Sequence, residues 1–107
     1  MTERDQHPAA AFDDIVHQRN RLGILAVLAE VDRADFPYLK NVLGLTDGNL
    51  GRHLEVLAEA RLVRITKGYE GKRPRTWAAI TRLGKDALDA ELHQMRALLQ
   101  RVDTQRT

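Results

Sequence analysis

The chain has 107 residues, of which 43% are hydrophobic and 30% are charged, a composition typical of one soluble globular domain. It contains no Cys, which excludes disulfides and thiolate metal sites. The first ten residues are polar and charged, unlike a secretory signal, and the longest apolar stretch, residues 22–29, is too short to span a membrane. We therefore expect a cytoplasmic protein with no membrane partner.

The net charge of +2 is unevenly distributed along the chain. Residues 61–85 contain eight basic side chains and one acidic side chain, a local charge of +7. Such a block in an almost neutral chain favours an anionic partner, of which nucleic acid is the commonest. The alternative is a solvated charged face without a partner.

The first half of the chain predicts helices. Residues 1–11 are polar and aperiodic, which indicates a disordered tail. Apolar residues between 12 and 28 recur at helical spacing, which predicts one bent helix or two short helices. A turn at residues 32–35 precedes a short helix that begins at Phe36-Pro37 and ends at Gly44. Thr46 is a favourable N-cap for the next helix, which extends to about Ala60.

The second half predicts a hairpin and a long helix. Residues 62–66 alternate and are rich in β-branched side chains, residues 68–74 have the composition of a turn, and residues 75–80 form a returning strand. Thr81 is the predicted N-cap of a helix over 82–102, followed by a disordered tail at 103–107. The expected fold class is therefore mainly α with a small β-hairpin (α+β), in one domain over residues 12–102.

The two short helices on either side of Gly44-Leu45 are arranged as a helix-turn-helix, in which the second helix enters the major groove of DNA. With Leu50, Leu54 and Leu57 turned inward, a rotation of about 100° per residue turns a small, polar face outward. The residues predicted to contact DNA from this helix are Thr46, Asp47, Gly48, Asn49, Gly51, Arg52, His53 and Glu55.

These residues differ in what they can contribute. Asn49 and Arg52 are chemically able to bind base edges, Arg to guanine and Asn to adenine. Gly48 and Gly51 are poor helix formers, which indicates close approach to DNA or, alternatively, a loose first turn. His53 lies beside the buried face, as expected of a boundary residue or a phosphate contact rather than a metal ligand.

The hairpin that follows is strongly basic, and a basic hairpin after a helix-turn-helix is the wing of a winged helix. Its predicted DNA contacts, along the backbone or in the minor groove, are Lys67, Tyr69, Lys72, Arg73 and Arg75. The alternative is a solvated hairpin whose charge only aids solubility. Trp77 on the returning strand is expected in the core, because a lone Trp in a strand usually packs.

The last helix carries an apolar stripe with the 4, 3, 4, 3 spacing of a heptad seam. The predicted dimer interface is Leu88, Leu92, Met95, Leu99 and Val102. One small domain can hardly bury the whole stripe, which favours pairing with a second copy through a two-fold interface. Packing on the first helix of the same chain is the alternative, and both can hold together.

Several stretches together resemble compact winged-helix transcriptional regulators related to the MarR and ArsR families. The stretches are residues 12–17, 21–25, 43–50, 53–57 and 67–76, within a resemblance that covers about residues 12–95. The resemblance implies a dimer with a recognition helix starting at Thr46 and the hairpin as wing. The metal chemistry of ArsR sensors depends on Cys, which this chain lacks, so we expect neither metal nor cofactor.

The function that these patterns favour is that of a DNA-binding transcriptional regulator, a repressor that binds a palindromic operator in double-stranded DNA as a homodimer. A winged-helix module that binds proteins without specific DNA binding is the alternative. A ligand-gated form would hold an apolar effector in a cleft between the first helix and the dimer helix, although no sequence feature identifies one. The four His are scattered and no catalytic motif is present, so we expect no enzyme activity.

Overall fold

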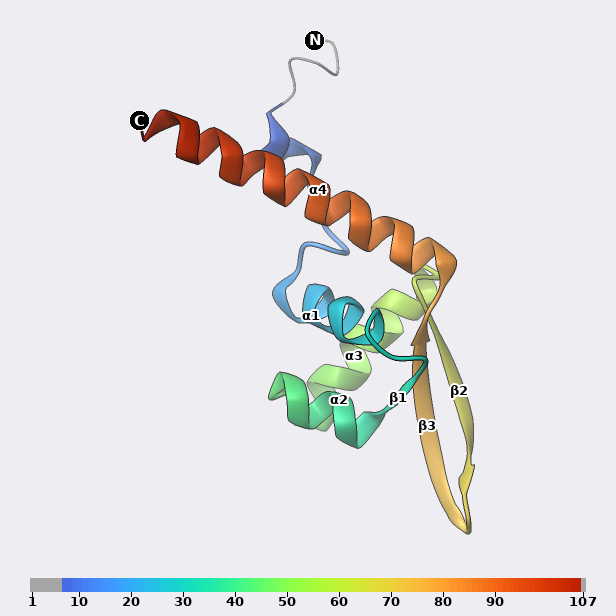
Figure 1. Ribbon diagram of the computed structural model, residues 1–107. Coiled ribbons are helices and arrows are strands. Elements are labelled where there is room, and N and C mark those ends of the chain that lie inside the picture. Colours follow the sequence, from blue (N-terminus) through green and yellow to red (C-terminus); the bar gives the residue numbers. More distant parts are fainter. Residues whose placement is uncertain (1–6, 107) are drawn as a thin grey trace.

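The computed structural model describes residues 7–106 and is elongated, with principal extents of 59 × 26 × 23 Å (Figure 1). The elements in chain order are the 3-10 helix η2 (Pro8–Ala11), α1 (Arg19–Leu28), β1 (Ala34–Asp35), α2 (Phe36–Leu43), α3 (Asp47–Glu59), β2 (Val63–Glu70), β3 (Arg73–Ile80) and α4 (Arg82–Gln105). The predicted α+β class, with a helix-turn-helix, a hairpin and a long last helix, is confirmed.

The helix ends follow the capping residues of the sequence. The Thr46 side chain accepts a hydrogen bond from the Asn49 N–H at 3.2 Å, and Thr81 caps α4 in the same way through Gly84 N–H at 3.0 Å. Gly44 ends α2 in the left-handed conformation, with φ 64°, which costs Gly little. Both predicted N-caps and the predicted end of α2 are therefore confirmed.

The core lies between α1, α2, α3, the sheet and the first half of α4. Each element contributes fully or almost fully buried apolar side chains, among them Ile24, Leu25, Leu28, Leu39, Leu50, Leu54, Leu57, Val63, Ala78 and Leu88. Burial of one such Leu stabilises the fold by about 1.5–3 kcal/mol relative to leaving it exposed. Because Leu50, Leu54 and Leu57 are all 0% exposed, the opposite face of α3 is turned to solvent.

The sheet has three antiparallel strands in the order β1-β3-β2. In the hairpin, Val63 pairs with Ile80 and Glu70 pairs with Arg73, so only Gly71 and Lys72 form the turn. The predicted turn over residues 68–74 is therefore too long. The outer part of the hairpin projects away from the helices (Figure 1), so no buried face imposes the apolar alternation that marks a strand in a sequence.

Two further segments differ from the sequence prediction. Residues 34–35, predicted as part of a turn, form β1, which pairs with Ala78 and Trp77 of β3. Residues 12–18 do not continue α1: the Asp13 carboxylate accepts hydrogen bonds from Ile15 N–H at 2.9 Å and Val16 N–H at 3.4 Å. Such local side-chain bonds compete with helical ones, and α1 begins only after Gln18, which caps it through Arg21 N–H.

The ends of the chain also depart from the expected disorder. Residues 8–11 form η2, which packs on α4 (Figure 1), and α4 continues to Gln105 rather than ending at Val102. The remainder of the two predicted tails, residues 1–6 and 107, lies outside the described residues. Glu91 of α4 is buried and holds residues 12–18 against that helix. Its carboxylate accepts a hydrogen bond from Asp13 N–H at 3.0 Å and lies 2.7 Å from His17 Nδ1.

Candidate nucleic-acid interface

The outward face of α3 is small and polar. Thr46, Asp47, Gly48, Asn49, Arg52 and Glu55 are exposed, whereas Gly51 and His53 are half-buried. A Cβ atom added at Gly48 or at Gly51 would meet no other atom within 4 Å. Neither glycine is therefore required by packing inside this chain, and both leave the α3 backbone open to approach from outside. Contact of this face with DNA stays a prediction.

The N-terminal turn of α3 is tied to α2. Lys40 Nζ lies 3.0 Å from an oxygen of Asp47, so the exposed Asp47 carboxylate already has a cationic neighbour. Its position in the first turn also suits the helix dipole. Asp47 therefore fits a role in fixing the two helices of the helix-turn-helix relative to each other, beside its predicted role at the interface.

His53 of α3 contacts two side chains of α1. Arg21 NH1 lies 3.3 Å from His53 Nδ1, and Asn20 Nδ2 lies 3.4 Å from Nε2. Because a guanidinium only donates, Nδ1 accepts and the ring proton belongs on Nε2. An Asn20 amide turned by 180° would then accept that proton through its oxygen.

The surroundings of His53 disfavour its charged form. Burial lowers the pKa of His53 below its ordinary value of 6.5, and the neighbouring charges of Arg21 and Arg52 lower it further. Sequence reasoning placed His53 at the boundary of the buried face, and its half-buried position agrees. The contact of Arg21 with His53 was not predicted, because no sequence pattern links two residues that are 32 positions apart. The Arg21 Nε also donates to the Ile15 carbonyl at 2.7 Å.

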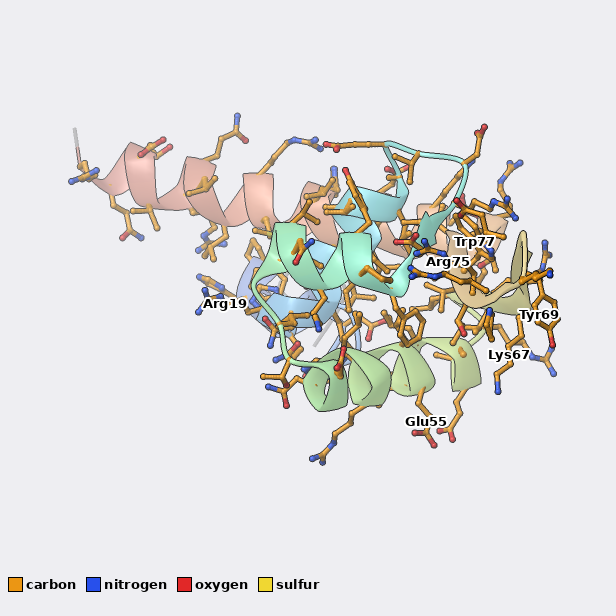
Figure 2. All side chains as sticks on the ribbon, turned by 90° about the horizontal axis from the view of Figure 1, so that it is seen from below. Arg19, Glu55, Lys67, Tyr69, Arg75 and Trp77 are labelled. Atoms are coloured by element: carbon orange, nitrogen blue, oxygen red, sulfur yellow. The ribbon has the colours of Figure 1, made fainter. Side chains whose placement is uncertain are left out.

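The hairpin presents most of its predicted DNA contacts to solvent. Lys67, Tyr69, Lys72 and Arg73 are exposed, and Tyr69 is 75% exposed. Figure 2 shows Glu55 of α3 and Lys67 of the hairpin projecting on the same side of the molecule. The outward face of α3 and the exposed cations of the hairpin together make up the candidate surface, which we call the α3–hairpin face.

Arg75 lies differently from the other hairpin cations. Its side chain is 25% exposed and points from the hairpin towards the start of α2 (Figure 2). Its NH1 donates to Asp35 Oδ2 at 3.0 Å, and its Nε lies 3.5 Å from Glu70 Oε2. Sequence reasoning grouped Arg75 with the exposed cations because it cannot detect a carboxylate that is 40 residues away.

Trp77 is half-buried rather than fully in the core, which corrects the sequence prediction. The guanidinium carbon of Arg33 lies 3.8 Å from the centre of its ring, a cation–π contact. Trp77 also lines a cavity of about 330 Å³ with Val31, Arg33, Ala34, Asp35 and Tyr38. The indole therefore packs beside β1 and Arg33 instead of filling the centre of the domain.

The apolar stripe of α4 is divided between two environments. Leu88 is 5% exposed and belongs to the core, and Leu92 and Met95 are half-buried. Leu99 and Val102 are 61% and 47% exposed, on the part of α4 that extends past α1, α2 and α3 (Figure 1). The first part of the predicted dimer seam, Leu88 and Leu92, therefore packs within the chain, whereas Leu99 and Val102 at its end are exposed.

Within residues 7–106, neither a cluster of metal-binding side chains nor a membrane-spanning helix is present. Across residues 7–106, no three His, Asp or Glu side chains are placed to bind a metal ion together. None of the helices in that range combines the length and the apolar character that a membrane crossing requires.

Comparison with known proteins points to DNA binding. Residues 20–99 match the family described as winged helix DNA-binding domain. The structure of a transcriptional regulator homologue from Pyrococcus horikoshii OT3 is 31% identical, with a TM-score of 0.85 over 92% of this chain and 99% of that one. An uncharacterized protein of Methanocaldococcus jannaschii is 35% identical over 83 residues, 78% of this chain and 90% of its own length.

A more distant structure shares the fold. NadR in complex with 4-hydroxyphenylacetate is 22% identical, with a TM-score of 0.60 over 91% of this chain and 69% of that one.

Proposed function

The chain belongs to the family of winged helix DNA-binding domains, and from this premise we propose that it is a transcriptional regulator that binds an operator in duplex DNA as a homodimer. In this proposal α3 is the recognition helix and enters the major groove. The hairpin of β2 and β3 is the wing, which lies along the sugar-phosphate backbone or in the adjacent minor groove.

The observation that carries the proposal is the composition of the α3–hairpin face. It combines glycines with open space around them, the exposed Asn49 and Arg52, and the exposed cations of the hairpin. Cations that neutralise phosphates provide affinity, and Arg or Asn at base edges provides sequence discrimination. A module that binds only proteins would need neither exposed cations for phosphates nor Arg and Asn side chains for base edges on the α3–hairpin face.

The dimer we propose forms through the C-terminal half of α4. Leu99 and Val102 are exposed there at heptad spacing from the buried Leu88, and a two-fold axis would bury the same surface of both copies. Two recognition helices would then reach half-sites about one helical turn of DNA apart. A palindromic operator follows from that symmetry.

We further propose that the regulator is a repressor, because a dimer bound to an operator excludes other proteins from the same DNA. Gating by a small molecule and a cytoplasmic location stay predictions. NadR is described with a bound phenolic acid. The cavity beside Trp77, about 330 Å³, is at the lower end of the range for small-molecule sites. It lies at the sheet edge, whereas the sequence placed an effector between the first helix and the dimer helix.

Selection of bound sequences from a random duplex pool tests the function. We expect enrichment of a palindrome, with binding that weakens steeply as salt rises. An enriched site without symmetry would contradict the dimer alone. Absence of any salt-sensitive binding to duplex DNA would contradict the function and favour the protein-interaction module.

Arg52→Ala on the selected operator tests the role of α3. Arg52 is exposed on the outward face of α3, and a bidentate contact with guanine contributes about 1–3 kcal/mol of discrimination. We therefore expect a lower ratio of operator affinity to scrambled-DNA affinity at one fixed salt concentration. Arg96→Ala, which removes an exposed arginine of α4, is the matched control. An equal decrease on both duplexes would make Arg52 a phosphate contact.

A further inference from the structure

The ion pair between Arg75 and Asp35 joins the hairpin to the start of α2. Arg75 NH1 donates to Asp35 Oδ2 at 3.0 Å, and the two side chains are only 25% and 18% exposed. The other oxygen of Asp35, Oδ1, accepts from Tyr38 N–H at 2.9 Å and caps α2. One carboxylate therefore fixes the first turn of the helix-turn-helix and one side chain of the hairpin together.

The ion pair lies on the part of the hairpin that extends beyond the three-stranded sheet. The three-stranded part of the sheet is short: β1 pairs with β3 only at Ala78 and Trp77. Arg75 lies two residues further towards the hairpin tip, about 7 Å at the usual rise of a strand. The residue opposite Arg75 on β2 is Gly68, which has no side chain to support it. Among the contacts described for the hairpin, the Arg75–Asp35 ion pair is therefore the one that connects the part of the hairpin beyond β1 to the helices.

The charges around Arg75 argue against a direct phosphate contact. Arg75 has Asp35 and Glu70 as partners, at 3.0 and 3.5 Å, so this group of three carries a net charge of −1. A phosphate approaching Arg75 would meet both carboxylates and would have to displace at least one of them. The exposed Lys67, Lys72 and Arg73 carry no such requirement.

We propose that Arg75 is a positioning residue: through Asp35 it fixes the angle between the hairpin and the helix-turn-helix, and so determines which phosphates Lys67, Lys72 and Arg73 reach. The inference rests on the proposed function for its consequence in DNA binding. The positioning itself is a property of the free protein.

Spin labels test the positioning without DNA. Because the chain has no Cys, Asn49→Cys and Lys72→Cys introduce one labelling site on α3 and one at the hairpin turn of each chain. Pulsed electron paramagnetic resonance on labelled chain mixed with excess unlabelled chain then gives the distance distribution within one copy. We expect Arg75→Gln and Asp35→Asn each to broaden or shift the distribution, while Arg73→Gln leaves it unchanged. Asn remains a good N-cap, so Asp35→Asn preserves the start of α2. An unchanged distribution in both variants would overturn the proposal, whether or not the protein binds DNA.

Salt titrations on the selected operator test the consequence. Arg73→Gln should lower the slope of log affinity against log salt by about one, as expected for one lost phosphate contact. Arg75→Gln and Asp35→Asn should keep the wild-type slope, and each should weaken binding by between about twofold and thirtyfold. The double variant should bind no more weakly than the weaker single variant, because both changes break the same contact.

If Arg75 contacted a phosphate directly, both the salt slope of Arg75→Gln and the affinity of Asp35→Asn would change differently. Arg75→Gln would then lower the slope by about one, and Asp35→Asn would tighten binding, because it removes a negative charge and releases Arg75 towards the DNA. Either result would overturn the proposal. Failure of the wild-type protein to bind any duplex would instead contradict the proposed function, and the spin-label distances would still decide whether Arg75 positions the hairpin.

Discussion

Gly84 in the first turn of α4 should not tolerate a side chain. A Cβ built on it would clash with the carbonyl oxygen of Leu62, and would lie 2.8 Å from Ile80 Cγ1 and 3.0 Å from Leu62 C. The Leu62 carbonyl is backbone and already accepts from Thr81 N–H at 3.0 Å, so it cannot rotate away. Gly84→Ala therefore has to separate the start of α4 from the chain that enters β2.

The net cost can be worked from two opposing effects. Ala is favoured over Gly inside a helix by about 1 kcal/mol. Overpacking costs about 1–3 kcal/mol, and we take the upper end because the clash is with backbone. A net loss of about 2 kcal/mol corresponds to a decrease in Tm of about 10 °C in a domain of this size. Circular dichroism during thermal and urea unfolding measures it.

Gly51→Ala is the matched control, because a Cβ there would have no atom within 4 Å. We expect Gly51→Ala to raise the free energy of unfolding by up to about 1 kcal/mol. If Gly84→Ala is as stable as the wild type, the close packing described for α4 against Leu62 is wrong. Gly51→Ala also tests the interface: weaker operator binding by this more stable variant would indicate that DNA approaches the α3 backbone closely.

Two further predictions concern the assembly and the response to pH. Leu99→Glu with Val102→Glu should give a monomer with wild-type helicity in sedimentation and circular dichroism, because both side chains are exposed within the chain but would be buried in the dimer. Gln100→Glu is the charge control, and a wild type that is already monomeric at micromolar concentration refutes the seam. His53 should make the protein less stable in acid: its pKa is lowered by burial and by Arg21 and Arg52, so the unfolded chain binds the proton more readily. The free energy of unfolding should decrease as pH falls below about 6.5, through the lowered pKa of the folded state, and a dependence that is unchanged in His53→Gln would exclude this residue as its cause.

The parts of the fold that sequence could predict are those whose causes are local. The end of α2 at Gly44 and the start of α3 at Thr46 depend on residues within one turn of the boundary. The inward face of α3 follows from the spacing of its leucines, which are all fully buried. The outward face, and with it most of the α3 part of the candidate site, then follows from helical geometry alone.

The parts that could not be predicted depend on partners far away in the chain. Residues 12–18 have helical spacing, but Asp13 N–H donates to Glu91, which is 78 residues away. Arg73 and Arg75 look alike in the sequence, because both are arginines of the same basic hairpin. In the structure, Arg75 donates to Asp35, whereas Arg73 is exposed. Composition can therefore locate a basic hairpin, but it cannot separate the cations that are free to meet DNA from those that hold the hairpin in place.

The stripe on α4 marks the limit of what spacing alone can establish. A helix of 24 residues is about 36 Å long at 1.5 Å per residue, whereas the two shorter extents of the molecule are 26 and 23 Å. The core can therefore cover only part of α4, and it covers the N-terminal part around Leu88. Packing within a chain and pairing between chains both require one apolar stripe, so a heptad pattern cannot distinguish them. The length of the helix relative to the core explains why Leu99 and Val102 stay exposed within this chain, and pairing with a second copy at these two residues stays a prediction.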